Sequence, residues 1–278
     1  MNLPATFPKL TGSAGWQAEL SLRHAPRRGR TVLVSREQHG PLLVQHPFYP
    51  EAGGVCHTYL LHPPAGIVGG DDLTLNLALE PGAHALITTP GATRWYYSRG
   101  LHAQSQLYAH VDENASLEWL PRESLLFDGA HARLATRIEL CGNARLLGWE
   151  ILGLGRPACG EIFEHGQLDF RFDIMRDGKP LLLERLRGAG PIAGLREHTA
   201  LASLVATPAD ASALEAARAV CSDAHEALCA ATLIGDLLVC RGIAAQCAPL
   251  INFCTRLWSE LRPGLLGRAA SPPRIWRT

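Results

Sequence analysis

Five carboxylates have apolar neighbours in the sequence. Of all residues, these are the ones whose type and position most suggest a chemical role. They are Asp71, Glu118, Glu150, Glu161 and Glu184. If they face solvent from strands or pair with arginine, they need no further explanation. If they are buried, each needs a partner cation, a metal ion or a proton. The sequence leaves both interpretations open.

Residue types that ligate metals are abundant in the 278 residues, but they are dispersed. The chain has 12 His and 8 Cys, yet it contains neither Cys-x-x-Cys nor a Cys/His quartet with zinc-finger spacing. Cys56-His57 is the only adjacent pair of soft ligands. We therefore expect mostly core cysteines with reduced thiols, and no tightly bound cofactor.

Motifs of the common enzyme and nucleotide-binding sites are missing from the sequence. The Gly-rich segment 66–70 lacks the Lys-Ser/Thr of a phosphate loop, and segment 153–157 is not Gly-x-Gly-x-x-Gly. There is no Gly-x-Ser-x-Gly and no His-Glu-x-x-His. The residues thus provide no catalytic constellation.

The charge balance argues against several binding classes. The 26 Lys and Arg residues are matched by 26 Asp and Glu residues, whereas nucleic-acid and polybasic membrane binders need clustered positive charge. The N-terminal residues show no secretory signal, and the longest apolar stretch, 227–240, is too short to span a bilayer of roughly 30 Å. We expect a cytoplasmic protein with no nucleic-acid or membrane partner.

The elements that must position these residues are mainly strands. Strand–turn–strand units recur with turn alanines at 83, 115 and 144, a pattern typical of stacked β layers or a β-solenoid, although a long antiparallel sheet remains an alternative. A further hairpin joins 168–174 to 181–186 through Asp177-Gly178. The fold class predicted is mainly β, layered and β-helix-like, with residues 1–200 as a β-rich layered domain.

Residues 201–278 are predicted to form an α/β portion that packs on this layered domain. A helix is expected over 209–220, with Asp210 or Ser212 as its N-cap, followed by one apolar strand over 232–241. A second helix is expected over 249–261, ended by Arg262-Pro263-Gly264.

Longer segments give the chain a family resemblance. They are residues 15–18, 40–42, 47–51, 59–71, 89–93, 117–121, 127–130, 154–157, 160–161, 182–186 and 273–276. With these segments, nearly the whole chain strongly resembles the UreD family (UreH in some bacteria) of urease accessory proteins. His46 stands where the family usually has Arg or Lys, and Ala65 where it usually has Gly.

The resemblance implies a nickel-insertion chaperone rather than an enzyme. Proteins of this family bind apo-urease and recruit UreF, which in turn holds the GTPase UreG that carries nickel. Nickel is then in transit through a water-filled passage to the urease active site, where two ions are bridged by a carbamylated lysine. The resemblance also implies a β-helix-like fold with helices near the C-terminus.

If the protein conducts nickel, the isolated carboxylates are the residues that we expect to contact the ion. A conduit must attract the ion and release it, so several weak oxygen sites serve better than one strong cluster. We therefore expect transient nickel contacts at Asp71, Asp72, Glu150, Glu161 and Glu184.

The aromatic segment that follows residue 94, together with the tail, supplies candidate partner contacts. Aromatic and arginine side chains are enriched in interface hot spots, although core positions are an equal alternative for the segment. The candidates are Trp95, Tyr96, Tyr97, Arg99 and Trp276.

Two other functions remain open at this stage. One is a scaffold that assembles the complex without carrying metal. The other is a β-solenoid carbohydrate hydrolase, which needs two carboxylates in one open groove. The isolated chain is expected to be poorly soluble, because surfaces for two partners would be exposed.

Overall fold

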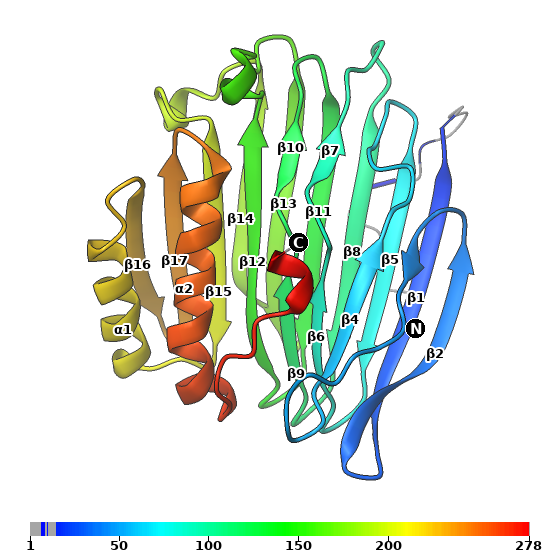
Figure 1. The fold of residues 1–278 in the computed structure, drawn as a ribbon, viewed down its shortest axis with the longest axis vertical. Coiled ribbons are helices and arrows are strands. Elements are labelled where there is room, and N and C mark those ends of the chain that lie inside the picture. The colour runs from blue at the N-terminus through cyan, green and yellow to red at the C-terminus, as the bar shows by residue number, and fades with distance from the viewer. Residues whose placement is uncertain (1–6, 9, 11–14, 278) are drawn as a thin grey trace.

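The computed structural model describes residues 7, 8, 10 and 15–277, and it arranges them as two facing β-sheets with two α-helices (Figure 1). Residues 1–6, 9, 11–14 and 278 lie outside the described residues, so most of the N-terminal segment behind the expectation of no secretory signal is not covered. Strands make up 49% of the chain, which confirms the mainly β fold class.

The seven-stranded sheet forms one layer. Its spatial order is β14 (Lys179–Ala189), β13 (Gln167–Arg176), β11 (His131–Leu140), β8 (Ala103–Val111), β5 (Asp72–Leu79), β1 (Gln17–Arg27) and β2 (Arg30–His39).

The ten-stranded sheet forms the other layer. Its main path is β16 (Leu228–Ile234), β17 (Leu237–Ala244), β15 (Ala200–Thr207), β12 (Arg145–Leu154), β9 (Ser116–Leu120), β6 (His84–Thr88), β4 (Cys56–Leu61) and β3 (Leu43–Val44). β10 (Ser124–Leu126) and β7 (Thr93–Trp95) join it through β12. Strands β15 to β17 continue this sheet directly from β12, so residues beyond 200 extend the same layer.

The alternation of strands between the two sheets confirms the solenoid expectation. Successive strands of each layer pair in parallel, as β5–β8–β11 and β6–β9–β12 do, and the coil makes about four turns. The turn alanines stack on one another: Ser116 N donates to Ala83 O at 2.8 Å, and Arg145 N donates to Ala115 O at 2.9 Å. Both alanines are buried, because only a small side chain fits between stacked turns.

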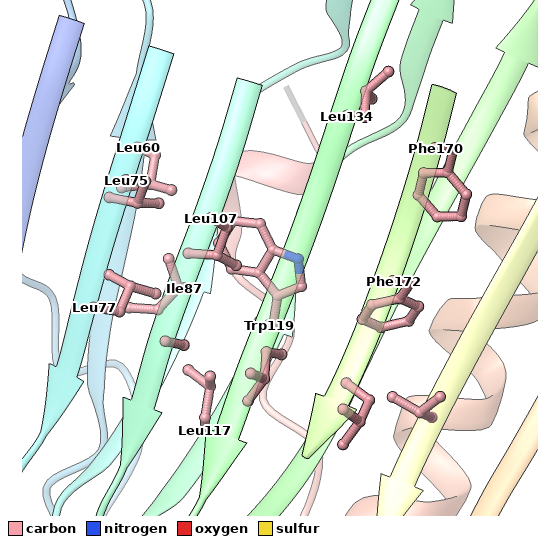
Figure 2. Packing of buried hydrophobic residues seen from close by; sticks show 14 of the residues in the cluster. Leu60, Leu75, Leu77, Ile87, Leu107, Leu117, Trp119, Leu134, Phe170 and Phe172 are labelled. Carbon is pink, nitrogen blue, oxygen red and sulfur yellow. The ribbon is translucent and has the colours of Figure 1, made fainter. Parts of the chain in front are cut away.

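The core between the sheets consists of alternate residues of each strand. Leu75, Leu77 and Leu107 point from the seven-stranded sheet toward Leu117 and Trp119 of the other sheet (Figure 2). The predicted hairpin is confirmed as β13–β14, where Asp177 and Gly178 both have positive φ, as a two-residue type I′ turn requires.

The C-terminal elements differ from expectation in two places. The single strand expected over 232–241 is wrong, because the chain reverses at Gly235 (φ +61°) and forms the hairpin β16–β17. Helix α1 (Ala211–Ser222) begins as expected, with Asp210 Oδ1 accepting from Ala213 N at 3.0 Å. The end expected at Arg262-Pro263-Gly264 is wrong too, since α2 (Cys247–Leu266) runs through Pro263 and ends at Gly267.

A buried polar cluster fastens α2 to the outer face of the ten-stranded sheet. Glu118 of β9 accepts from Arg262 Nε at 2.9 Å, from Trp258 Nε1 at 2.6 Å, and contacts His84 Nε2 at 2.7 Å. Burial alone would raise the pKa of Glu118, but the hydrogen bonds from His84 and Arg262 lower it to about 2. The ion pair between Glu118 and Arg262 explains why the helix continues past Arg262.

The short segments η1 (Pro157–Cys159), η2 (Ala193–Leu195) and η3 (Arg274–Arg277) complete the described chain. None of its helices has the length and apolar character that crossing a bilayer requires.

Candidate functional site

A cavity of about 470 Å³ lies between the two sheets. Its walls are mostly apolar side chains that meet across the layers, among them Leu60, Leu75, Leu107 and Trp119 (Figure 2). Exposed loop residues such as Ala65 and Gly91 also line the cavity, so it opens to solvent at this point. We call these two segments, residues 61–66 and 89–94, the mouth.

Glu150 is the carboxylate that this cavity contains. The side chain of Glu150 extends from β12 into the space between the sheets and is only 9% exposed. Its Oε1 accepts from Trp119 Nε1 at 2.8 Å and from Thr136 Oγ1, on the opposite sheet, at 2.6 Å. Burial raises the pKa of Glu150, although both hydrogen bonds oppose that shift. Because both donors use Oε1, Oε2 is the oxygen left to bind a proton or a cation.

Polar side chains continue from Glu150 toward the edge of the sheets. In the ten-stranded sheet, Glu150 lies opposite Ser203 of β15, and Ser203 lies opposite Arg241 of β17. From the facing sheet, Glu184 of β14 accepts from Ser203 Oγ at 3.0 Å and from Arg241 Nη2 at 2.7 Å. Directly paired residues on neighbouring strands lie about 5 Å apart. Glu150, Ser203, Glu184 and Arg241 therefore form one row, which we call the polar row.

The two ends of the polar row differ in exposure. Glu150 is enclosed, whereas the side chain of Arg241 is 54% exposed and that of Glu184 is 14% exposed. The row thus leads from Glu150, which lines the cavity, to the exposed side chain of Arg241 on β17, next to the edge strand β16.

His62 lies at the mouth and was not singled out from the sequence. Burial lowers the pKa of His62, and the charge of Asp71 opposes that shift. Its Nε2 makes no hydrogen bond within the part of the chain that the structure describes. A neutral imidazole with an unpaired nitrogen is able to ligate a divalent cation.

Asp71 and Asp72 hold backbone rather than line the cavity. Asp71 is 1% exposed; its Oδ1 accepts from Trp16 N at 2.7 Å and its Oδ2 from Val68 N at 2.9 Å. Asp72 Oδ2 accepts from Leu10 N at 3.3 Å. These bonds fix the loop that leads from the mouth into β5.

Glu161 also lies away from the cavity. It forms an ion pair with Arg156, with Nη2 and Oε2 2.5 Å apart, and accepts from Asp128 N at 3.2 Å. Arg156 in turn stacks on the ring of Phe127 at 4.3 Å. The structure therefore brings Glu150 and Glu184 together in one row, but it leaves Glu161 outside that row.

The aromatic segment is divided between interior and surface. Trp95 is 1% exposed and lines the cavity, and Tyr96 packs edge-on against Phe127 at 5.1 Å. Tyr97 is 67% exposed, and Arg99 is exposed as well. Among these four, only Tyr97 and Arg99 offer an exposed side chain to a partner.

Trp276 seals the protein's own core. Its ring lies 5.8 Å from that of Trp149 and 5.6 Å from that of Trp258, and its Nε1 donates to Thr88 Oγ1 at 2.9 Å. The side chain is partly buried against the core, so it holds the C-terminal segment against the ten-stranded sheet.

The side chains of Cys56 and His57 point to opposite faces of β4. Successive side chains of a strand point to opposite faces. Cys56 Sγ approaches Thr58 Oγ1 at 3.8 Å, whereas His57 Nε2 contacts Glu51 at 2.8 Å. The two side chains therefore have different surroundings and do not share one ion.

Thr136, Ser203 and Arg241 were missed from the sequence. Each stands on a strand whose inward positions are mostly apolar; Thr136, for example, lies between Leu134 and Ile138 on the inner face of β11. A polar residue in an apolar period-two pattern was the available signal.

Known proteins resemble this chain along almost its whole length. The family described as "UreD urease accessory protein" matches residues 17–277. A relative from Pseudomonas putida strain W619 is 48% identical over 266 residues, 95% of each chain. One from strain GB-1 is 47% identical over 279 residues, 100% of each chain. One from Klebsiella aerogenes is 43% identical over 268 residues, 95% of this chain and 97% of the relative. All three relatives carry the name "Urease accessory protein UreD".

Proposed function

The chain belongs to the UreD family of urease accessory proteins, and from that premise we propose that it binds apo-urease, recruits UreF with UreG, and conducts nickel to urease. The observation that carries the conduit proposal is the cavity with Glu150 at its inner end, continued by the polar row. In this proposal nickel contacts three residues of the conduit in turn, which we call stations. From the mouth to the far edge they are His62, Glu150 and Glu184.

Weak binding at each station suits a conduit. Nickel(II) lies high in the Irving–Williams order, so a site with several thiolates and imidazoles would retain it. Glu150 offers one oxygen, and burial raises its pKa, which makes the proton a competitor for that oxygen.

Arg241 acts as a gate at the far station. Its guanidinium forms an ion pair with the carboxylate of Glu184, and this positive charge repels a divalent cation. Because the side chain of Arg241 is half exposed, the ion pair is worth only about 0–1 kcal/mol after solvent screening, so Arg241 is easily displaced. Opening this pair frees Glu184 for the ion.

Asp71, Asp72 and Glu161 are assigned a positioning role in this proposal. Asp71 and Asp72 fix the loop beside the mouth, and Glu161 fixes the neighbouring loop at Asp128. The three carboxylates keep the entrance in shape rather than contact the ion in passage.

Exposed apolar side chains lie at both ends of the route. Tyr97, Val68 and Leu101 are 67%, 43% and 52% exposed near the mouth, where Gly69 packs against Ser98 and Leu101. At the far edge, Leu183 of β14 and Leu228 of β16 are 54% and 62% exposed. We place one partner at each end, so that the ion passes from protein to protein.

The two alternative functions are separated from this proposal by geometry and by experiment. Glu150 is enclosed between the sheets, whereas a polysaccharide hydrolase needs an open groove between its carboxylates, so nothing favours that activity. A scaffold without conduction remains as the competing proposal. Pull-down with apo-urease and UreF tests assembly, and nickel content of urease matured with Glu150→Gln tests conduction. Normal assembly with normal nickel loading would leave the scaffold role alone.

A further inference from the structure

A second group of metal-ligating side chains lies outside the passage. We propose that His110, Asp112 and Cys141 form an exchangeable binding site for a divalent transition metal ion such as nickel or zinc. The proposal is independent of conduction and adds a site at the turn end of the solenoid, beyond the cavity residue Leu107 on β8.

The solenoid repeat brings the three residues together. His110 pairs with Glu139 of β11 in parallel register, and Cys141 N donates to Val111 O at 2.9 Å. Residues 29 to 31 positions apart in the chain thereby become neighbours at successive turns. For this reason, no Cys/His motif within a single segment of the sequence indicates the site.

Two of the three spacings between the ligand atoms are close to those around a tetrahedral ion. His110 Nε2 lies 3.1 Å from Asp112 Oδ1 and 3.6 Å from Cys141 Sγ, and all three atoms lie within 4.8 Å of one another. An ion with bonds of about 2.0–2.3 Å separates nitrogen from oxygen by about 3.4 Å and nitrogen from sulfur by about 3.5 Å. An ion thus binds with little rearrangement of the imidazole.

The surroundings favour a cation and allow it to reach the site. The side chains of His110 and Asp112 are 22% and 37% exposed, so a metal ion enters from solvent and keeps a water ligand. Burial raises the pKa of Cys141, and the charges of Asp112, Asp177 and Glu139 raise it further. A bound cation reverses this effect, because it stabilises the thiolate and is attracted by the same carboxylates.

The donor set defines both the class of ion and the strength of binding. Thiolate with imidazole selects nickel, zinc or cobalt over magnesium and calcium. The Nδ1 of His110 is buried without a hydrogen-bond partner among the described residues. A ligating His usually donates this proton to an acceptor, whose loss costs about 10–100-fold in affinity. The site is therefore an exchangeable one rather than a structural one.

Cobalt(II) titration of the full-length chain tests the proposal, because cobalt–thiolate bonds give a charge-transfer absorption. The wild-type protein should develop this band with one equivalent of Co²⁺ and lose it when Ni²⁺ or Zn²⁺ is added. Cys141→Ser should abolish the band, and Asp112→Asn should weaken binding about tenfold or more. Cys159→Ser is the matched control, because Cys159 is also a free thiol but exposed and outside the trio.

Two results would overturn the site. One is the absence of the charge-transfer band from the wild type at stoichiometric Co²⁺. The other is a band that survives Cys141→Ser and disappears in Cys159→Ser. Circular dichroism of each variant establishes that the fold is retained, so that a lost band reports a lost ligand.

Discussion

Glu150→Gln separates the charge of the buried carboxylate from its structural role. Glutamine has the same shape, and its amide oxygen still accepts from Trp119 and Thr136 at the position of Oε1. Only the charge and the proton-binding oxygen are lost. We expect the fold and the complex with urease to persist, while nickel passes more slowly.

The size of the nickel effect follows from electrostatics. At an effective dielectric constant of about 20, two unit charges 4 Å apart attract by about 4 kcal/mol, so a divalent ion and one carboxylate attract by roughly 8 kcal/mol. Much of this attraction offsets the ion's desolvation. If a quarter of it remains, the variant raises the barrier by about 2 kcal/mol and slows transfer roughly 30-fold.

Glu150→Gln should slow nickel transfer, but it should not lower the stability of the fold. Because burial raises the folded-state pKa of Glu150, the ionised carboxylate costs stability as the pH rises above the pKa of an unfolded Glu and through the folded value. Glu150→Gln should therefore be as stable as the wild type in acid, and equally or more stable at pH 7. Thermal unfolding between pH 4 and pH 8 measures this difference.

The assay is maturation of purified apo-urease with this chain, UreF, UreG, GTP, carbon dioxide and Ni²⁺, followed over time by urease nickel content. Glu215→Gln is the matched control, since it removes an exposed carboxylate of α1 that lies outside the cavity. The reasoning is refuted if Glu150→Gln assembles at normal stoichiometry and loads nickel as fast as the wild type.

Three other predictions concern the anchor of α2, the gate and the mouth. Glu118→Gln should cost about 1–3 kcal/mol at pH 7, because it removes one of the two carboxylates that pair with the buried Arg262, Glu51 being the other. Wild-type stability should fall as the pH drops from 4.5 toward the lowered pKa of about 2, and urea unfolding from pH 7 to pH 3 checks both effects. Glu184→Gln should slow nickel loading, whereas Arg241→Ala should not slow it, and equal slowing in both variants would contradict the gate. Ala65 has φ +62°, so Ala65→Gly should gain roughly 1 kcal/mol, seen as a higher melting temperature, and an unchanged or lower one would contradict the strain.

Local patterns predicted the layered fold well, because each strand–turn–strand unit contains the alternating apolar residues and the turn residues that define it. The alternation in residues 73–79 and the Asp177-Gly178 turn are local properties, and both give the observed elements. The hairpin of β16 and β17 was taken for one strand, since its apolar residues run on across Gly235. The end of α2 was misplaced because Arg262 gains its partner Glu118 only in the folded protein.

The candidate site was predictable only in part. The apolar neighbours of Glu150 indicated burial, but whether a carboxylate is enclosed, as Glu150 is, or binds backbone, as Asp71 does, depends on tertiary contacts. Trp95 and Trp276 illustrate the same limit, since aromatic side chains serve cores and interfaces equally well. The polar row joins residues of four strands, β12, β14, β15 and β17, and no single segment contains it.

Blocking the cavity tests conduction most directly. Ser105 lines the cavity from β8, where Leu73 and Leu134 flank it on neighbouring strands, so Ser105→Trp fills the space without removing a charge. The decisive measurement is the nickel content of urease matured with Ser105→Trp, beside Ser105→Ala, in complexes of verified composition. Conduction through this protein predicts intact complexes with urease largely free of nickel for the tryptophan variant and normal loading for the alanine variant. Normal loading with the cavity filled would contradict it.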